Sequence, residues 1–178
     1  MTAQNTKILL IDDDAEIRYS LDRVLSQDGH EVVAADSGED GIQKAKELKP
    51  SLIFLDNRMG GISGIETLQH LRSAAPDSMV ILMTAYGTTQ TAIEAMKHGA
   101  FDYVLKPFDL LKLKDLVRKA LKASRDSFSD SEESYELLLN TADYAEGIVG
   151  SGEKMQQVLK KVGQVAASEA TVMITGES

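Results

Sequence analysis

Five short apolar runs recur along the first 125 residues, and a stretch with helical periodicity follows each of them. The runs occupy residues 7–11, 30–34, 51–55, 79–83 and 101–105. Short continuous apolar runs are typical of strands that are covered on both faces of a parallel sheet. Strands and helices in this alternation predict right-handed crossovers and a doubly wound α/β fold, with helices on both faces of an open sheet.

Residues that commonly begin or end helices lie between these runs. Asp28 with Gly29, Lys49 with Pro50, and His98 with Gly99 are predicted to end helices. Asp109 is predicted to cap the start of the last helix.

Polar residues follow four of the five predicted strands, where ligands bind in sheets of this kind. They are Asp12, Asp13 and Asp14 after the first strand, Asp56 after the third, Thr84 after the fourth and Lys106 after the fifth. Because several carboxylates at one place repel one another, the group is expected to bind a cation. Oxygen ligands without His or Cys favour Mg²⁺ over zinc.

This combination of groups suits phosphoryl transfer onto a carboxylate. Asp56 is the predicted nucleophile, and the adjacent acids are predicted to bind the metal. Lys106 would pair with the carboxylate or the phosphate, and the Thr84 hydroxyl would donate to a phosphoryl oxygen.

Two other interpretations of the acids follow from the same residues. A single Asp after a strand is commonly a helix N-cap, and Asp14 before Ala15 fits that role. Haloacid-dehalogenase-like phosphatases carry D-x-D-x-[TV] after a first strand. Asp12 and Asp14 match that pattern, but Glu16 stands in place of Thr or Val.

The composition excludes several other classes. The chain has no Cys, which excludes disulfides, thiolate nucleophiles and Cys-based metal sites. A net charge of −9 argues against nucleic-acid binding by this chain. Because the chain has no long apolar stretch, we expect neither a signal peptide nor a membrane span. The expected location is the cytoplasm.

The charge pattern changes near residue 125. Residues 1–125 hold 16 basic and 18 acidic side chains, whereas residues 126–178 hold 3 and 10. A domain over residues 1–125 is therefore expected, followed by an acidic linker over 126–145 and a further segment over 146–178. An apolar cluster at Tyr135 and residues 137–139 could form a short helix in the linker or belong to a solvated spacer.

Four segments resemble the signatures of two-component response-regulator receiver domains, in a match that spans residues 5–125. They are LLIDDDAEIR, LIFLDNRMGGISG, ILMTAYG and FDYVLKPF. The resemblance implies a flavodoxin-like (βα)5 fold and phosphorylation of Asp56 by a partner histidine kinase or a small acyl phosphate. It also implies Mg²⁺ bound by Asp13, Asp56 and the backbone carbonyl of Arg58, with Asp12 acting through water.

The same resemblance makes Thr84 and Tyr103 a switch pair, in which Thr84 moves toward the phosphoryl group and Tyr103 turns inward. From the residues alone, Tyr103 is expected to be a half-buried strand aromatic. The family usually has Pro in the loop where this chain reads Met59-Gly60-Gly61. Gly gives the loop more freedom than Pro, so a more mobile loop without loss of the chemistry is predicted.

Residues 146–178 resemble the beginning of the AAA+ ATPase domain of sigma-54-dependent activators. From the residues, Ser151 is expected to cap a helix with Met155, Val158, Leu159 and Val162 on one face. Residues 170–175 are expected to form a buried strand that is left unpaired in this chain. TGES is similar to the first half of a phosphate-binding loop, but the Lys and hydroxyl of G-x-x-x-x-G-K-[ST] are missing. No nucleotide binding is therefore predicted for this chain.

Together these features predict the regulatory part of a nitrogen-regulatory or dicarboxylate-transport type activator, cut at the start of its ATPase domain. The chain would not be an enzyme, although it accepts a phosphoryl group and could remove it again. Expected partners are a histidine kinase and a second copy through the receiver and linker, while sigma-54 RNA polymerase and DNA would be reached only through other domains. A stand-alone receiver that acts by docking or phosphorelay is the alternative, and residues 146–178 argue against it.

Overall fold

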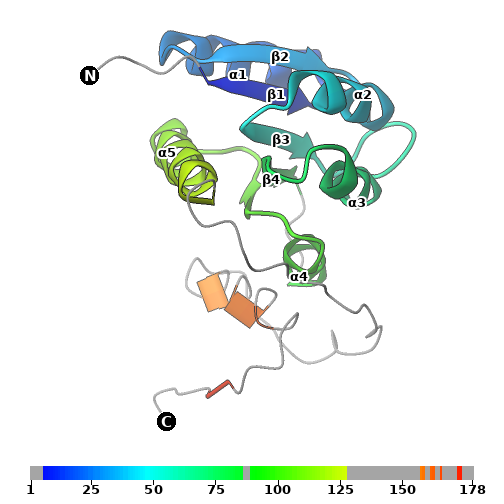
Figure 1. Ribbon diagram of the computed structural model, residues 1–178, viewed down its shortest axis with the longest axis vertical. Helices are drawn as coiled ribbons and strands as arrows, with labels where there is room; N and C mark the ends of the chain where they lie inside the picture. Colours follow the sequence, from blue (N-terminus) through cyan, green and yellow to red (C-terminus); the bar gives the residue numbers. More distant parts are fainter. Residues whose placement is uncertain are drawn as a thin grey trace.

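The computed structural model describes residues 6–85 and 89–127, together with residues 157–158, 161–162, 165 and 172–173. The first two ranges form a single parallel sheet with helices on both faces (Figure 1). The strands, in chain order, are β1 (Lys7–Ile11), β2 (Glu31–Ala35), β3 (Leu52–Asp56), β4 (Met79–Thr84) and β5 (Asp102–Leu105). The helices are α1 (Ala15–Gln27), α2 (Gly38–Leu48), α3 (Gly64–Ala74), α4 (Thr89–Lys97) and α5 (Leu110–Ser127).

The strand order is β2-β1-β3-β4-β5, so the chain reverses direction across the sheet after β2. In open α/β sheets, ligands bind beyond the carboxyl ends of the strands at such a reversal, here between β1 and β3. The observed topology confirms the predicted flavodoxin-like (βα)5 arrangement of parallel strands.

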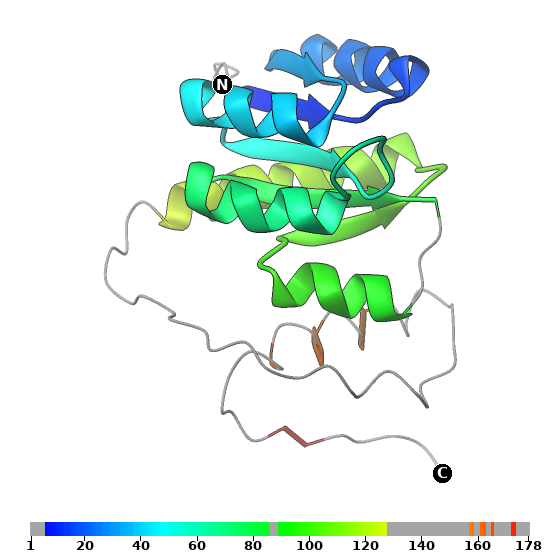
Figure 2. The ribbon, with the colours of Figure 1, turned by 90° about the vertical axis from the view of Figure 1, so that its right-hand side faces the viewer.

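Alternate side chains of the central strands point to opposite faces of the sheet and build two apolar layers. Leu9 and Ile11 of β1 pack with residues of α2, α3 and α4. Ile8 and Leu10 pack with residues of α1 and α5. Figure 2 shows these helices on either side of the twisted sheet. Because both faces of β1, β3 and β4 are covered, their apolar runs are almost continuous, as the sequence predicted.

The predicted helix boundaries are confirmed where the structure gives their geometry. The Asp14 side chain caps α1 by accepting the Glu16 and Ile17 N–H groups. Asp109 caps α5 by accepting the Leu111 N–H over 2.8 Å. Gly29 and Gly99, after α1 and α4, have φ values of +87° and +82°, where a residue with a Cβ would be strained.

The linker over 126–145 lies outside the described residues except at the end of α5. Beyond it, Val158 and Val162 are helical, in agreement with the helix predicted from Ser151. Val172 and Met173, inside the strand expected over 170–175, are 54% and 86% exposed, so the expected burial is wrong there, whereas their lack of a strand partner agrees with the prediction of an unpaired segment. A strand requires a hydrogen-bonded neighbour, and none of the five described strands pairs with these residues.

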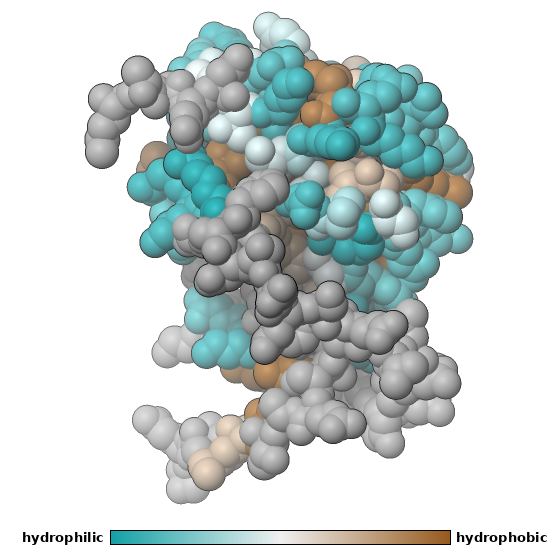
Figure 3. Space-filling view, in the orientation of Figure 1, coloured by the Kyte–Doolittle hydropathy of each residue, from teal (hydrophilic) through white to brown (hydrophobic). Residues whose placement is uncertain are grey.

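In the view of Figure 3, hydrophilic residues cover most of the described surface, with small hydrophobic areas between them. None of the described helices has the length and apolar character that crossing a bilayer would require.

Candidate functional site

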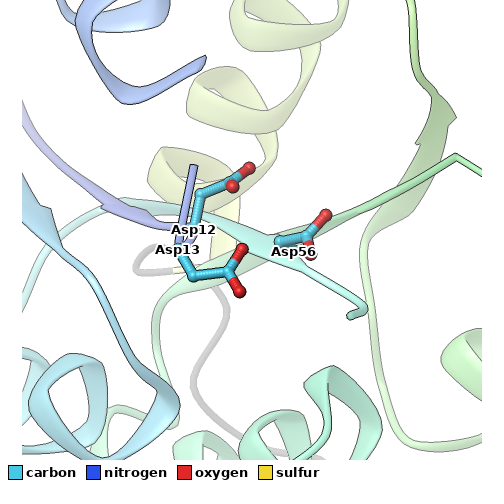
Figure 4. A group of neighbouring side chains, drawn as sticks. All are labelled: Asp12, Asp13 and Asp56. Carbon is cyan, nitrogen blue, oxygen red and sulfur yellow. The ribbon is translucent and has the colours of Figure 1, made fainter. Parts of the chain in front are cut away.

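Three carboxylates meet at the carboxyl ends of β1 and β3. Asp56 is the last residue of β3, while Asp12 and Asp13 directly follow β1. Because β1 and β3 are parallel neighbours, with Ile11 beside Leu55, their ends lie at the same edge of the sheet. One carboxylate oxygen from each of Asp12, Asp13 and Asp56 lies within 4.8 Å of the others (Figure 4). The sequence-based grouping of these acids is therefore confirmed in space.

Burial distinguishes the three acids. Asp12 and Asp56 are 1% and 5% exposed, whereas Asp13 is exposed. Two buried carboxylates side by side are stable only when a cation or a proton offsets their charge.

Lys106 follows β5, which lies on the other side of β4 from β3, and it supplies a positive charge to the three acids. Its Nζ atom lies 2.6 Å from Asp56 Oδ1 and 2.7 Å from Asp12 Oδ2. The backbone N–H of Lys106 donates to the carbonyl of Thr84 over 2.8 Å, which fixes the lysine beside the end of β4. The peptide bond between Lys106 and Pro107 is cis.

The pKa values of Asp12 and Lys106 reflect this arrangement. Burial raises the pKa of Asp12 above its ordinary value, because desolvation outweighs the hydrogen bonds from Lys106 and the Asp14 backbone. Burial alone would lower the pKa of Lys106, but the hydrogen bonds and charges of Asp12 and Asp56 hold it above its ordinary value. Lys106 is therefore charged at neutral pH and suited to hold an anionic group at this edge of the sheet.

Backbone N–H groups position the three acids. Arg58 N donates to Asp56 Oδ2 over 2.8 Å, and Asp14 N donates to Asp12 Oδ1 over 3.0 Å. Asp13 Oδ2 accepts from Gly60 N over 3.3 Å. Both oxygens of Asp56 are thus engaged, one by Lys106 and the other by the Arg58 amide.

Thr84 ends β4, next to β3, and is 2% exposed. Met83, the residue before it, is the register partner of Asp56, so Thr84 lies at the same edge of the sheet as the acids. Tyr103 lies on the neighbouring strand β5, with Leu82 as its register partner. It is 5% exposed and belongs to the apolar layer under α2, α3 and α4.

The burial of Tyr103 corrects the half-buried position expected from the residues alone. Its ring packs in a layer to which α4 contributes Ala92, Ala95 and Met96. Burial raises the pKa of the Tyr103 phenol, and the charge of Asp102 acts in the same direction.

Asp14 does not belong to the group of acids. Its carboxylate accepts the Glu16 N–H over 2.8 Å and the Ile17 N–H over 3.3 Å at the start of α1. The haloacid-dehalogenase pattern needs Asp14 at the reacting centre, so this N-cap role argues against that alternative.

Sequence reasoning missed two further contributors to the site. Arg18 on α1 donates from a terminal guanidinium nitrogen to the backbone carbonyl of Asp12 over 2.5 Å. Gly64 begins α3 so close to the strand end that a Cβ there would lie 2.3 Å from the carbonyl oxygen of Asp56. Long-range contacts of this kind leave no periodic signal in the sequence.

The ligand set fits a hard divalent cation. The acidic oxygens of Asp12, Asp13 and Asp56 are the donors that Mg²⁺ prefers, and the described group contains no nitrogen or sulfur ligand. Arg58 is held beside Asp56 by its backbone N–H, which donates to Asp56 Oδ2.

Comparison with known proteins identifies related sequences. A family model described as the response regulator receiver domain matches residues 8–118. The transcriptional regulatory protein ZraR of Salmonella typhimurium is 36% identical over 172 residues, which cover 96% of this chain and 37% of ZraR. The regulatory protein AtoC of Escherichia coli is 35% identical over 178 residues, which cover 100% of this chain and 38% of AtoC. The chain thus spans just over a third of the length of these relatives.

Two solved structures share this fold and are also similar to the chain in sequence. NtrX from Brucella abortus, in complex with ATP, has a TM-score of 0.68 and 27% identity, over 92% of this chain and 35% of the NtrX chain. TrrA from Thermotoga maritima, in complex with Mg²⁺ and beryllium fluoride, has a TM-score of 0.59 and 34% identity, over 65% of this chain and 98% of TrrA.

Proposed function

Because the chain belongs to the response regulator receiver domain family, we propose that Asp56 is its phosphoacceptor and that phosphorylation switches the output of a sigma-54-dependent transcription activator. The membership confirms the resemblance found in the four motifs. The observation that carries the proposal is the contact of Lys106 Nζ with both Asp12 and Asp56, beside a third carboxylate from Asp13.

The proposed step transfers one phosphoryl group to a side-chain oxygen. A carboxylate oxygen of Asp56 attacks the phosphorus atom of the donor, and a new P–O bond forms. The bond from phosphorus to the donor's nitrogen or oxygen breaks, and the leaving imidazole or carboxylate keeps the electron pair. The donor is a histidine kinase or a small acyl phosphate.

The other residues hold charge in place during this transfer. Lys106 neutralises an oxygen of the transferred group, since its ammonium already lies within hydrogen-bonding distance of Asp56. The Thr84 hydroxyl donates to another phosphoryl oxygen. The Arg58 backbone N–H fixes the orientation of the Asp56 carboxylate before the reaction.

Mg²⁺ is the proposed cofactor, bound by Asp13, Asp56 and the backbone carbonyl of Arg58, with Asp12 acting through water. When bound, it supplies positive charge next to the phosphoryl oxygens. The TrrA relative, solved with Mg²⁺ and beryllium fluoride, supports this assignment.

Thr84 and Tyr103 form the proposed switch. Thr84 would move toward the phosphoryl group, and Tyr103 would occupy the space behind it. Tyr103 is already only 5% exposed in this structure, so the proposed inward turn would change its packing rather than its exposure to water.

The proposed context follows from the relatives named as transcriptional regulators. Residues 1–125 would be the receiver, 126–145 an acidic linker, and 146–178 the beginning of an AAA+ domain that contacts sigma-54 RNA polymerase in the whole protein. A homodimer through the receiver and linker would transmit the signal. The protein is proposed to act in the cytoplasm, as a phosphoryl acceptor rather than as an enzyme with turnover.

Solution mass measured by light scattering tests this proposal. Mg²⁺ and beryllium fluoride together imitate the phosphoryl group, and the measurement compares the wild type with Asp56→Asn. A mass change that requires Asp56 supports both the site and control through assembly. Beryllium and magnesium bound without a change in mass would support the site but contradict control through assembly of this chain, and an absence of binding would contradict the site.

A further inference from the structure

Asp13 is the exposed member of the acidic group, and a residue far away in the sequence orients it. Its Oδ2 atom accepts the backbone N–H of Gly60, 47 positions along the chain, over 3.3 Å. Within the described residues this is the hydrogen bond that the Asp13 carboxylate accepts. It connects the turn after β1 directly to the loop between β3 and α3.

The donor at Gly60 is its backbone N–H, and the space next to this residue is open. A Cβ added at Gly60 would have nothing within 4 Å, so the position is open on that side. At the next residue, Gly61, φ is +94° and a Cβ would lie 3.0 Å from Glu39 Oε1. The Glu39 carboxylate therefore lies beside this loop, and the Gly60 N–H is a donor in an acidic region.

We propose that the Gly60 N–H is a positioning group for Mg²⁺ binding, which holds Asp13 toward Asp12 and Asp56. This inference rests on the proposed function, since it takes Asp13 as a metal ligand. A carboxylate has about four lone-pair positions, so Oδ2 can accept the N–H while the other oxygen contacts a cation. An exposed Asp without this bond would sample several rotamers, and the metal would have to order it on binding.

Two substitutions at position 60 distinguish the loss of the N–H donor from the other effects of replacing glycine. Gly60→Pro removes the donor, whereas Gly60→Ala keeps it and adds a methyl group in open space. Both substitutions restrict the unfolded chain and the loop, so stiffness changes in the same direction in each. Loss of one hydrogen bond predicts Mg²⁺ binding that is roughly threefold to tenfold weaker in Gly60→Pro. Gly60→Ala is expected to bind as the wild type does.

The experiment is a calorimetric titration of the full chain with MgCl₂, for both variants and in an Asp13→Ala background. Without the Asp13 carboxylate, Gly60→Pro should have no further effect on Mg²⁺ affinity. Equal affinities for Gly60→Pro and Gly60→Ala would contradict the inference while leaving the proposed metal site intact. A wild type that binds no Mg²⁺ would contradict the proposed metal site itself, and the inference with it.

A second measurement keeps the inference testable if Gly60→Pro fails to fold. In the metal-free protein, hydrogen exchange of the Gly60 amide should be faster in Asp13→Ala than in the wild type. Exchange at the amide of Leu71, inside α3, provides the reference. An unchanged exchange rate at Gly60 would show that Asp13 does not hold this amide and would overturn the inference.

Discussion

Lys106 Nζ lies 2.6 Å from Asp56 Oδ1, although β5, which Lys106 directly follows, and β3, which Asp56 ends, are separated by β4. The lysine side chain therefore reaches across the end of β4. This contact requires β3, β4 and β5, the lower strands of the sheet in Figure 1, to be paired in register, because the Lys106 backbone is itself bonded to Thr84 on β4. The proposed phosphoacceptor site is therefore complete only when β3, β4 and β5 are paired.

Lys106→Met is predicted to lower the free energy of unfolding without metal by about 3 kcal/mol, because it leaves the Asp12 and Asp56 carboxylates buried without their cation. Urea unfolding with and without Mg²⁺ measures the effect. Mg²⁺ should restore more stability to the variant than to the wild type, because it replaces the missing charge. Lys114→Met is the control, since its pair with Asp28 has a similar length of 2.7 Å but is 38% and 37% exposed. The control should lose less than about 1 kcal/mol, and equal losses in the two variants would contradict the account.

His30 is predicted to make the stability of the fold depend on pH. Its Nδ1 atom is buried and has no hydrogen bond among the described residues. Burial lowers the pKa of His30 below its ordinary 6.5, the charge of Arg125 adds to this, and Asp28 opposes it. Because the unfolded chain binds the proton more readily, the free energy of unfolding should fall as the pH drops below 6.5 toward the lowered pKa.

Urea unfolding at about pH 7.5 and about pH 5.5 measures the dependence on His30. His30→Gln should lose less stability between the two pH values than the wild type does. His70→Gln, a change at an exposed histidine of α3, should keep the wild-type dependence. If all three proteins lose the same stability, His30 is not the cause.

Gly64→Ala is predicted to destabilise the fold by about 2 kcal/mol, because its Cβ would lie 2.3 Å from the Asp56 carbonyl oxygen and 2.5 Å from Asn57 Cα. The same distortion should move the Asp56 carboxylate and weaken Mg²⁺ binding. Thermal unfolding and a Mg²⁺ titration measure the two effects. Gly60→Ala is the matched control, and a Gly64→Ala variant as stable as this control would show that the close approach is easily relieved.

The loop after β3 is predicted to be more mobile with Gly60 than with Pro at this position. Proline restricts φ and reduces the conformations that the loop can sample. Hydrogen exchange at the amides of Met59 and Gly61 should therefore be faster in the wild type than in Gly60→Pro. Exchange in the wild type that is no faster than in the variant would contradict this prediction.

The sequence predicted the strands well because their burial leaves a direct trace in hydropathy. β1 has the predicted bounds, but β2 and β3 begin and end one residue later than their apolar runs. The difference arises because hydrogen bonding, not hydropathy, decides where a strand ends. Polar Asp56 pairs with Met83, and Thr84 pairs with Leu105, so both belong to the sheet.

The candidate site was predictable in its residue types and less so in its contacts. Asp12, Asp13, Asp56 and Lys106 follow strands, and parallel strands bring their carboxyl ends to one edge. The contacts from Arg18 to Asp12 and from Gly60 to Asp13 depend on where a helix and a loop lie after folding. Val172 and Met173, expected in a buried strand over 170–175, are exposed for a related reason, since hydropathy alone cannot supply a neighbouring strand to cover them.

The mass of the intact chain after incubation with acetyl phosphate and Mg²⁺ tests the proposed phosphoacceptor most directly. The account predicts that the wild type gains the mass of one phosphoryl group, that Asp14→Asn gains it as well, and that Asp56→Asn does not. The gain should disappear when a chelator removes Mg²⁺. An equal gain in wild type and Asp56→Asn, or no gain in either, would contradict the assignment of Asp56.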